Sequence, residues 1–226
     1  MSERQDKPFI ITIDGPAGAG KSTLAKKLAA HVGAIYLDTG SMYRAATLKI
    51  VEERVDIHDE QAVHQALCST EIQFVKYDEI LMDNRNVESL IRSRAIDKTV
   101  SLISSYSDVR KKMVGLQRDF ARTHKTVVEG RDVGSVVFPK ADVKFFLTAD
   151  LNERAARRQK ELKEKGVEAV YEDIRKEIRE RDRLDESREH SPLKVPDGAF
   201  VVDTTHLGIE DVLKALTGKT IEVLNL

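Results

Sequence analysis

The sequence predicts an α/β fold with a mostly parallel central sheet, because short apolar segments alternate with helical patterns along most of the chain. The segments apolar enough to form buried strands are residues 9–13, 34–37, 126–129, 143–148 and 199–203. Most of the intervals between them carry apolar residues at helical spacing. We therefore expect a central five-stranded parallel sheet flanked by helices.

The first strand, at 9–13, leads into a glycine-rich turn that fits the phosphate-binding pattern G-x-x-x-x-G-K-[ST] without a mismatch. A helical pattern follows, and strand, glycine loop and helix in this order are the setting that the motif requires. Backbone N–H groups of such a loop surround phosphate oxygens. Lys21 is expected to reach the β- and γ-phosphates of a nucleoside triphosphate, and Ser22 to hold Mg²⁺. The predicted nucleotide-binding residues are Gly15, Pro16, Ala17, Gly18, Ala19, Gly20, Lys21, Ser22 and Thr23.

The second strand, at 34–37, is followed by a Thr-Gly turn and by a helix that we expect to begin near Ser41. Tyr43 and Arg44 then fall in its first turn. Arginine is suited to bind a phosphate dianion through two parallel hydrogen bonds. A capped helix with a solvated arginine fits the same pattern, so these residues alone leave both interpretations open.

Residues 55–100 interrupt the alternation of strands and helices. Two apolar runs, 71–76 and 80–82, flank a polar turn at 77–79 and predict a small antiparallel hairpin. We therefore interpret 55–100 as an inserted subdomain. A helical pattern follows at 101–122.

Charged residues follow directly on the strand at 126–129. Glu129, Arg131 and Asp132 lie at its carboxyl end, with glycines beside them. Ligands of open α/β sheets bind at that edge, and packing does not explain charges there. We favour a functional role over a surface turn.

Residues 151–188 are highly charged and helical, with a weak point at Gly166. Two stripes of charged residues at helical spacing lie within them: Arg154, Arg157 and Arg158 in the first half, and Arg181, Asp185 and Arg188 in the second. The first stripe suits a polyanion, although charge runs usually form solvated faces. The second also fits ordinary surface ion pairs. The segment is therefore either a solvated hairpin or a mobile lid.

The composition favours a cytoplasmic enzyme. The 226 residues suit one core sheet with insertions, and 37 basic residues nearly balance 38 acidic ones, so we expect neither nucleic acid nor membrane as a partner. The N-terminus has no apolar signal segment, and no stretch approaches the roughly 20 apolar residues of a membrane helix. The single cysteine, Cys68, excludes an internal disulfide and is expected to be a small buried hydrophobe. The six histidines show no metal-ligand spacing.

Several stretches together resemble the bacterial cytidylate kinases, of the nucleoside monophosphate kinase group of P-loop proteins. They are IDGPAGAGKST at 13–23, LDTGSMYR at 37–44, EGRDVGSVVFP at 129–139, ERAARR at 153–158 and RDRLDESREHSPL at 181–193. The first stretch alone would indicate only a nucleotide, whereas the third and the fifth are specific to the family. Glu129 departs from several relatives, which have Asp there. The carboxylate is kept, so we expect its role to survive with altered reach.

The resemblance implies transfer of a phosphoryl group from ATP to CMP or dCMP, giving ADP and CDP or dCDP, with Mg²⁺ as cofactor and a monomeric chain. The implied catalytic residues are Lys21, Arg131, Arg154, Arg157 and Arg158, of which the last three close over the transferring group as a lid. The implied acceptor-binding residues are Thr39, Tyr43, Arg44, Ser101, Arg110, Arg131, Asp132, Arg181, Asp185 and Arg188.

Within that acceptor set the resemblance gives each residue a part. Arg44, Arg131 and Arg188 would hold the acceptor phosphate, with Thr39 nearby. Asp132, Arg110 and Ser101 would read cytosine, which offers an amino donor beside acceptor atoms. Asp185, held by Arg181, would bind the ribose hydroxyls.

The resemblance also divides the chain into a core (1–54, 101–152 and 182–226), an acceptor-binding insertion (55–100) and a lid (153–181). We expect the insertion and the lid to close separately, with the lid arginines away from Lys21 until both substrates bind. Another small-acceptor kinase, acting on UMP, AMP, dTMP or shikimate, is an alternative. A P-loop GTPase switch is a second, against which the lack of an N-K-x-D stretch counts. Intact Lys21 and Ser22 count against a catalytically silent regulator.

Overall fold

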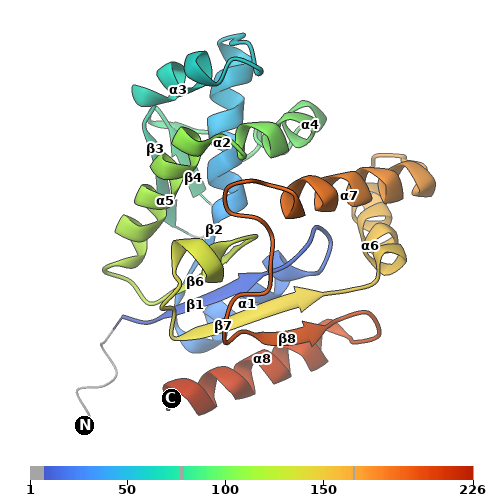
Figure 1. The fold of residues 1–226 in the computed structure, drawn as a ribbon. Helices are drawn as coiled ribbons and strands as arrows, with labels where there is room; N and C mark the ends of the chain where they lie inside the picture. The colour runs from blue at the N-terminus through green and yellow to red at the C-terminus, as the bar shows by residue number, and fades with distance from the viewer. Residues whose placement is uncertain (1–7, 77–78, 165, 226) are drawn as a thin grey trace.

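A computed structural model describes residues 8–76, 79–164 and 166–225. At its centre lies a five-stranded parallel sheet in the order β2-β6-β1-β7-β8 (Figure 1). Its strands are β1 (Ile10–Asp14), β2 (Ile35–Asp38), β6 (Thr126–Gly130), β7 (Val143–Thr148) and β8 (Phe200–Asp203). The fold class is therefore confirmed, and each predicted strand is found to within a residue at either end.

Helices cover both faces of this sheet because successive side chains of each strand point to opposite sides. On one face α1 (Lys21–Val32) and α8 (Ile209–Leu224) pack against the strands, and Leu28 and Leu216 are buried beside Ile11. On the other face lie α2 (Thr39–Glu52) and α5 (Ser107–Ala121), where Met42 and Met113 are buried. The sheet is thus the middle layer of three, and its carboxyl edge stays open to ligands.

The segment between α2 and α5 forms a separate small unit above the sheet (Figure 1). It contains α3 (Glu60–Cys68), β3 (Ile72–Lys76), β4 (Glu79–Met82), β5 (Arg85–Asn86) and α4 (Arg94–Ile103). The predicted hairpin is confirmed by antiparallel pairing of Ile72 with Met82, although residues 77–78 of its turn lie outside the described residues. The short strand β5 adds a third strand that the sequence did not predict.

The helix predicted over 101–122 is two helices. α4 ends at Ile103 and α5 begins at Ser107, with Tyr106 as its N-cap residue in an extended conformation. The Tyr106 hydroxyl donates to the carbonyl oxygen of Ile57 at 2.7 Å. This contact with the preceding unit fixes the bend between the two helices.

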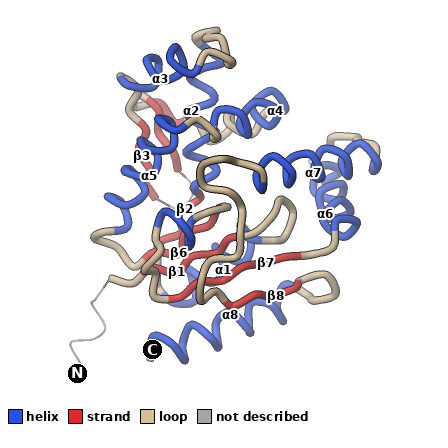
Figure 2. Tube along the Cα trace, viewed as in Figure 1, coloured by secondary structure: helices blue, strands red, loops and turns tan. Residues whose placement is uncertain are grey.

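The charged region after β7 folds as two packed helices, α6 (Leu151–Glu164) and α7 (Tyr171–Glu186), separated by the region of Gly166 (Figure 2). Ala155, Ile174 and Ile178 form their small apolar core. The predicted boundaries at 101 and 182 fall inside α4 and α7. The division into core, insertion and lid therefore stays a prediction.

Candidate active site

The phosphate-binding motif lies between the end of β1 and the start of α1. A Cβ on Gly15, where φ is +147°, would lie 2.0 Å from the backbone oxygen of Leu147. A Cβ on Gly18, where φ is +77°, would lie 3.0 Å from Cβ of Arg154. The loop therefore packs closely against β7 and α6 because it carries no side chains at these points. Its backbone amides are left at the N-terminus of α1, where an anion is favoured.

Lys21 is the first residue of α1 and is buried. Its Nζ donates to the carbonyl oxygen of Pro16 at 2.8 Å. Burial, and then the positive charge of Arg131, lower the pKa of Lys21 to about 7. No carboxylate of the described residues forms an ion pair with this ammonium, and a buried charge in that position favours an anionic ligand.

Glu129 lies near the end of β6 and accepts two hydrogen bonds through Oε1. Ser22 Oγ donates at 2.5 Å and the Tyr36 hydroxyl at 2.9 Å. Burial, and then the charge of Asp38, raise the pKa of Glu129. The hydroxyl of Ser22 and the carboxylate form a pair of hard oxygen donors, which fits Mg²⁺. In the described ranges, His, Cys, Asp and Glu form no group of three or more placed to hold a metal ion.

Asp14 anchors the segment that follows β6. Its carboxylate accepts hydrogen bonds from the backbone N–H groups of Val133 and Gly134, both at 2.7 Å. These residues begin a short π-helical turn (Val133–Val137), directly after Asp132. Burial of Asp14 at the end of the central strand raises its pKa to about 6. The carboxylate thus connects β1 to the turn that carries the predicted base-reading residue.

We expect Asp14 to make the stability of the protein fall as the pH rises from about 4 to about 6. The folded protein holds this proton more tightly than the unfolded chain, and a shift of this size corresponds to roughly 3 kcal/mol. Asp14→Asn cannot ionise and lacks this dependence. Denaturant unfolding from pH 4 to 7 should show the variant gaining about 3 kcal/mol relative to the wild type. Parallel curves for the two proteins would contradict the assignment.

Asp185, near the end of α7, joins two of the predicted phosphate-binding arginines. Its Oδ2 accepts from Arg131 Nε at 2.8 Å, and its Oδ1 accepts from Arg188 Nη2 at 2.5 Å. Burial opposes ionisation of this carboxyl, but the charges of Arg131 and Arg188 outweigh it and lower the pKa. The expectation that Arg181 holds Asp185 is wrong. Arg131 and Arg188 form the hydrogen bonds to this carboxylate, and Arg181 contributes only its positive charge, which helps to lower the pKa of Asp185.

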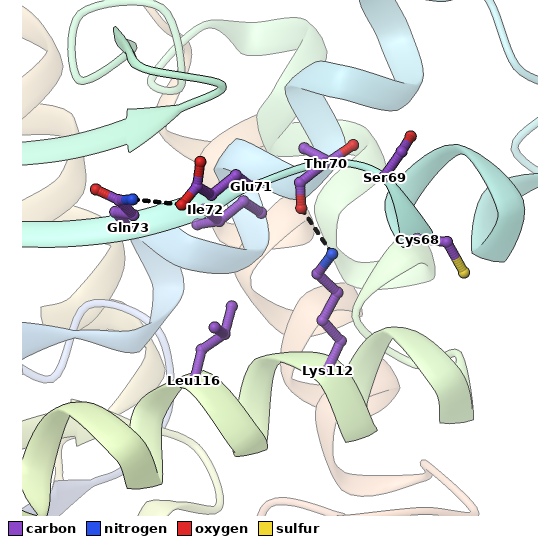
Figure 3. Close-up of a pocket in the computed structure, with 8 residues that line it drawn as sticks. All are labelled: Cys68, Ser69, Thr70, Glu71, Ile72, Gln73, Lys112 and Leu116. Atoms are coloured by element: carbon purple, nitrogen blue, oxygen red, sulfur yellow. Dashed lines mark hydrogen bonds between the residues drawn. The ribbon is translucent and has the colours of Figure 1, made fainter.

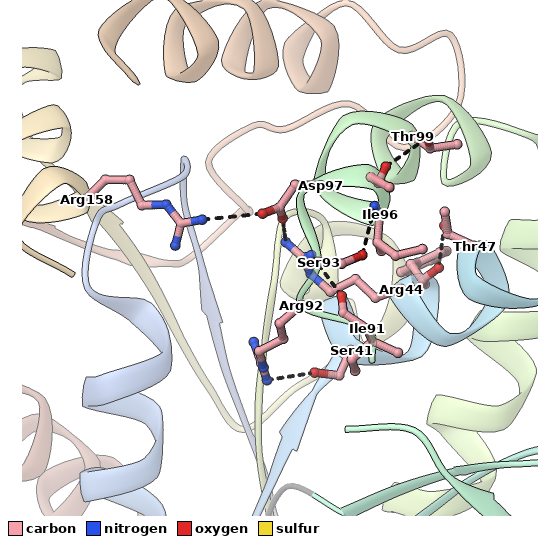
Figure 4. A network of polar contacts seen from close by, with 12 residues as sticks. Ser41, Arg44, Thr47, Ile91, Arg92, Ser93, Ile96, Asp97, Thr99 and Arg158 are labelled. Carbon is pink, nitrogen blue, oxygen red and sulfur yellow. Dashed lines mark hydrogen bonds and ion pairs between the residues drawn. The ribbon is translucent and has the colours of Figure 1, made fainter. Parts of the chain in front are cut away.

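Arg181 and Arg44 lie near this cluster. Burial, and then the charge of Arg131, lower the pKa of Arg181 to about 10, and its buried Nε has no hydrogen-bond partner among the described residues. Arg44 pairs through Nη2 with Oδ1 of Asp97 at 2.6 Å (Figure 4). The site therefore gathers Arg44, Arg131, Arg181 and Arg188 around the two carboxylates of Asp97 and Asp185. Such an excess of guanidinium suits a phosphate dianion.

Arg110 and Asp132 form a buried ion pair between Nη2 and Oδ2. Arg110 Nη1 donates to the carbonyl oxygen of Ser104 at 3.2 Å, while its Nε is buried without a partner in the described part of the chain. The Tyr43 ring lies against this guanidinium, with Cζ 5.4 Å from the ring centroid. The pair predicted from the sequence is therefore brought together, and it keeps a donor for a ligand.

The hydrogen bonds of Ser101 and Thr39 each involve one backbone carbonyl oxygen. The carbonyl oxygen of Ser101 accepts from Ser104 Oγ at 3.1 Å. Thr39 Oγ1 donates to the carbonyl oxygen of Glu129 at 2.7 Å, which joins the start of α2 to β6. α2 begins at Thr39 rather than near Ser41, because the side chain of Asp38 caps it.

The three arginines predicted for the lid contact different parts of the fold. Arg154 Nη1 donates to the carbonyl oxygen of Ala17 at 3.1 Å and pairs with Asp182 at 2.5 Å. Arg157 donates through Nη2 to the carbonyl oxygen of Thr204 at 2.6 Å. Arg158 reaches Asp97 at 3.4 Å. Arg154 thus contacts the nucleotide loop, since α6 packs directly on Gly18, whereas the expected separation of the lid arginines from Lys21 stays a prediction.

Sequence reasoning missed several residues that hold the site together. Asp182 accepts from the backbone N–H of Ala17 at 3.3 Å, and Ser104 Oγ accepts from Arg188 Nη2 at 2.9 Å. Ser104 lies one helical turn after Ser101, and Asp182 directly follows Arg181, so both stand beside predicted residues. Only that adjacency could have indicated them.

Two cavities lie away from this cluster. One of about 360 Å³ lies between the end of α3, β3 and α5, where Lys112 donates to the carbonyl oxygen of Thr70 at 2.6 Å (Figure 3). None of the predicted site residues lines it. Cys68, at its rim, is exposed, so its predicted burial is wrong. α3 buries Val63 and Leu67, and this leaves Cys68 on the outer face beside His64, with Sγ 3.3 Å from Nε2.

In the ranges that the structure describes, no helix combines the length and the apolar character needed to cross a membrane. Two solved structures share the fold. An uncharacterized protein from Eubacterium ventriosum has a TM-score of 0.53 at 12% identity, with 95% of this chain and 98% of that chain covered. A gluconokinase from Sinorhizobium meliloti has a TM-score of 0.51 at 13% identity, with 96% and 95% covered. At these identities the likeness concerns the fold alone.

The sequence comparisons identify the family. A cytidylate kinase from Caldanaerobacter subterraneus subsp. tengcongensis is 47% identical over 204 residues, which cover 90% of this chain and 91% of the relative. Another from Carboxydothermus hydrogenoformans is 46% identical, with 91% and 94% covered. The model of the family described as cytidylate kinase matches residues 11–221. The chain therefore belongs to the cytidylate kinase family.

Proposed function

We propose that this chain transfers the γ-phosphoryl group of ATP to CMP or dCMP, giving ADP and CDP or dCDP. One observation carries the assignment of the acceptor: the buried pair of Arg110 and Asp132 keeps an unpartnered donor, Arg110 Nε. Cytosine presents an amino donor beside acceptor atoms. A carboxylate oxygen facing the amino group and a guanidinium N–H facing an acceptor atom complement that edge.

On the donor side we assign Lys21 and the loop amides to the ATP phosphates. The ammonium is buried and hydrogen-bonded only to a carbonyl oxygen in the described structure, which leaves its charge for the phosphates. Ser22 would hold Mg²⁺, with Glu129 beside it as a second oxygen donor. When bound, Mg²⁺ would neutralise charge on the β- and γ-phosphates.

On the acceptor side an oxygen of the CMP phosphate attacks the γ-phosphorus directly, so no side chain has to act as a nucleophile. The chain positions the reactants and stabilises the charge that spreads over the transferring group. We assign Arg44, Arg131, Arg181 and Arg188 to the acceptor phosphate. Asp185, which accepts from Arg131 and Arg188, would orient both arginines, and we assign its remaining acceptor capacity to a ribose hydroxyl.

We further propose that α6 and α7 act as a lid and residues 55–100 as the acceptor-binding insertion. Arg154 already lies against the loop, whereas Arg157 and Arg158 would approach the donor phosphates on closure. Closure would exclude water and so prevent hydrolysis of ATP. Because one chain supplies every residue of the proposed site, we propose a monomer. We also propose that it works in the cytoplasm.

The proposal is tested by measuring ADP release with CMP, dCMP, UMP, AMP, GMP, dTMP and shikimate as acceptors. We expect CMP and dCMP to give the highest kcat/KM, and UMP to follow as a weaker acceptor. The other compounds should give rates near the ATP-only background. A preference for AMP, dTMP or shikimate would contradict the cytosine assignment, and equal ATP hydrolysis in all samples would contradict kinase activity.

A further inference from the structure

Asp97 lies between two arginines that come from different units of the fold. Its Oδ1 pairs with Arg44 Nη2 of α2 at 2.6 Å, and its Oδ2 lies 3.4 Å from Arg158 Nη2 of α6 (Figure 4). Figure 4 shows Arg158 reaching across from the lid toward the helix that carries Asp97. One carboxylate thus connects a proposed acceptor-phosphate arginine to a proposed lid arginine.

The position of Asp97 makes it a well-placed anion. It lies in the first turn of α4, where the helix dipole favours a negative charge. The Arg44 and Asp97 side chains are only 14% and 27% exposed, so water screens this pair weakly. The charge of Asp97 also acts on Arg181, where it partly opposes the lowering of the pKa that burial and Arg131 cause.

The contacts of Arg44 leave part of its guanidinium for a ligand. Nη1 donates to the carbonyl oxygen of Ile91 at 3.2 Å, and Nη2 is held by Asp97. In the described structure Nε makes no hydrogen bond to protein. Two of the three nitrogens are therefore fixed, which orients the group and leaves Nε for an anion.

The contacts of Arg158 show the second role of Asp97. Arg158 Nη1 donates to Glu161 on its own helix at 2.8 Å, and Asp97 is the residue of the described part of α4 with which it pairs. If the pair with Asp97 is lost, Glu161 can hold Arg158 along the surface of α6. The carboxylate of Asp97 thus favours the arrangement in which Arg158 faces the acceptor side.

We infer that Asp97 is a positioning residue that couples acceptor binding to the lid: it orients Arg44 toward the acceptor phosphate and holds Arg158 on the acceptor side, from which lid closure brings it to the transferring group. This inference rests on the proposed function, because it assigns Asp97 to the acceptor site of that reaction. Asp97 acts through the two arginines and touches neither substrate.

Asp97 could instead act only as a tether, that is, as an ion pair that joins α4 to the lid without orienting Arg44. The chain offers a second ion pair between the same two units as a matched control for this alternative. Arg94, also on α4, lies 3.5 Å from Glu177 on α7, and these side chains are 78% and 61% exposed. The pair joins the same two units without contacting Arg44 or Arg158. Glu177→Gln therefore removes a tether and leaves the proposed positioning intact.

The experiment compares steady-state kinetics of the wild type, Asp97→Asn and Glu177→Gln, with CMP and ATP varied in turn. Asp97→Asn should raise KM for CMP and lower kcat, each by about threefold to tenfold, with KM for ATP nearly unchanged. Glu177→Gln should stay within twofold of the wild type. Asp97→Glu, which restores the charge on a longer side chain, should recover part of the loss in both parameters.

A second set of kinetic measurements, made on variants that also carry Arg158→Ala, separates the effect of Asp97 on Arg44 from its effect on Arg158. There Asp97→Asn should still raise KM for CMP but should lower kcat no further, because the group it acts on is absent. An unchanged KM for CMP in a folded Asp97→Asn, or the same loss of kcat in both backgrounds, overturns the inference. If Asp97→Asn and Glu177→Gln change kcat and KM by the same factors, Asp97 is only a tether and the inference is overturned. A wild-type enzyme that does not use CMP would refute the proposed function itself.

Discussion

Replacing Lys21 by alanine should lower kcat by about a hundredfold to a thousandfold or more, because we assign its ammonium to the donor phosphates. Preorganised charge in a buried site contributes far more than the same charge in water. Lys21 is buried, and its pKa is lowered to about 7 by that burial. Removing a group whose charged form is disfavoured should not reduce stability. We therefore expect the melting temperature of Lys21→Ala to equal or exceed that of the wild type.

The measurement is ADP release with saturating CMP, together with a thermal melt of each protein. Lys27→Ala is the matched control, because Lys27 lies on the same helix and is exposed, with Glu210 as its partner at 2.9 Å. The control should keep wild-type turnover. A folded Lys21→Ala with turnover close to the wild type would show that the charge acts elsewhere.

Replacing Asp132 by asparagine should narrow the ratio of kcat/KM for CMP to that for UMP by about fivefold to a hundredfold. Uracil presents a carbonyl oxygen where cytosine presents an amino group, so in the wild type a carboxylate oxygen would face another acceptor. An unpaired buried group costs about 1–3 kcal/mol, which gives this range. An amide at position 132 can donate to that carbonyl and removes the penalty for UMP.

The ratio of kcat/KM for CMP to that for UMP also controls for damage to the fold. Arg110 would lose its carboxylate partner, and breaking a buried ion pair is destabilising. That loss lowers the rates with both nucleotides alike, whereas the ratio responds only to how the base is bound. If Asp132→Asn keeps the wild-type ratio, another residue discriminates between the bases.

The strands of the core could be predicted because buried parallel strands are continuous apolar runs of fixed length. The break between α4 and α5 could not. No glycine or proline marks Ser104–Tyr106, and the bend depends on a hydrogen bond from Tyr106 to Ile57, which is distant in sequence. The exposure of Cys68 could have been predicted, because Val63 and Leu67 mark the opposite face of α3.

The motif residues of the site could also be predicted, but their partners could not. Helical spacing placed Arg181, Asp185 and Arg188 on one stripe, and the family resemblance added Arg131 from a separate motif. Neither indicated that Asp185, rather than Arg181, organises Arg131 and Arg188, since that depends on which side chains meet after folding. Asp97 lies outside every motif, and its two ion pairs become evident only when folding brings α4 beside α2 and α6.

The order of strands in the sheet has a consequence for how the enzyme is assembled. β1, which carries the nucleotide loop, has β6 and β7 as its neighbours, and Ile10 pairs with Thr126. A nascent chain that ends before residue 126 contains the complete loop motif but lacks both strands that flank β1. Such distant pairings form late, because a long loop must close before they contribute. The nucleotide loop therefore reaches its final setting only once β6 and β7 have been made, and no fragment that ends before residue 126 holds a complete donor site of the kind we propose.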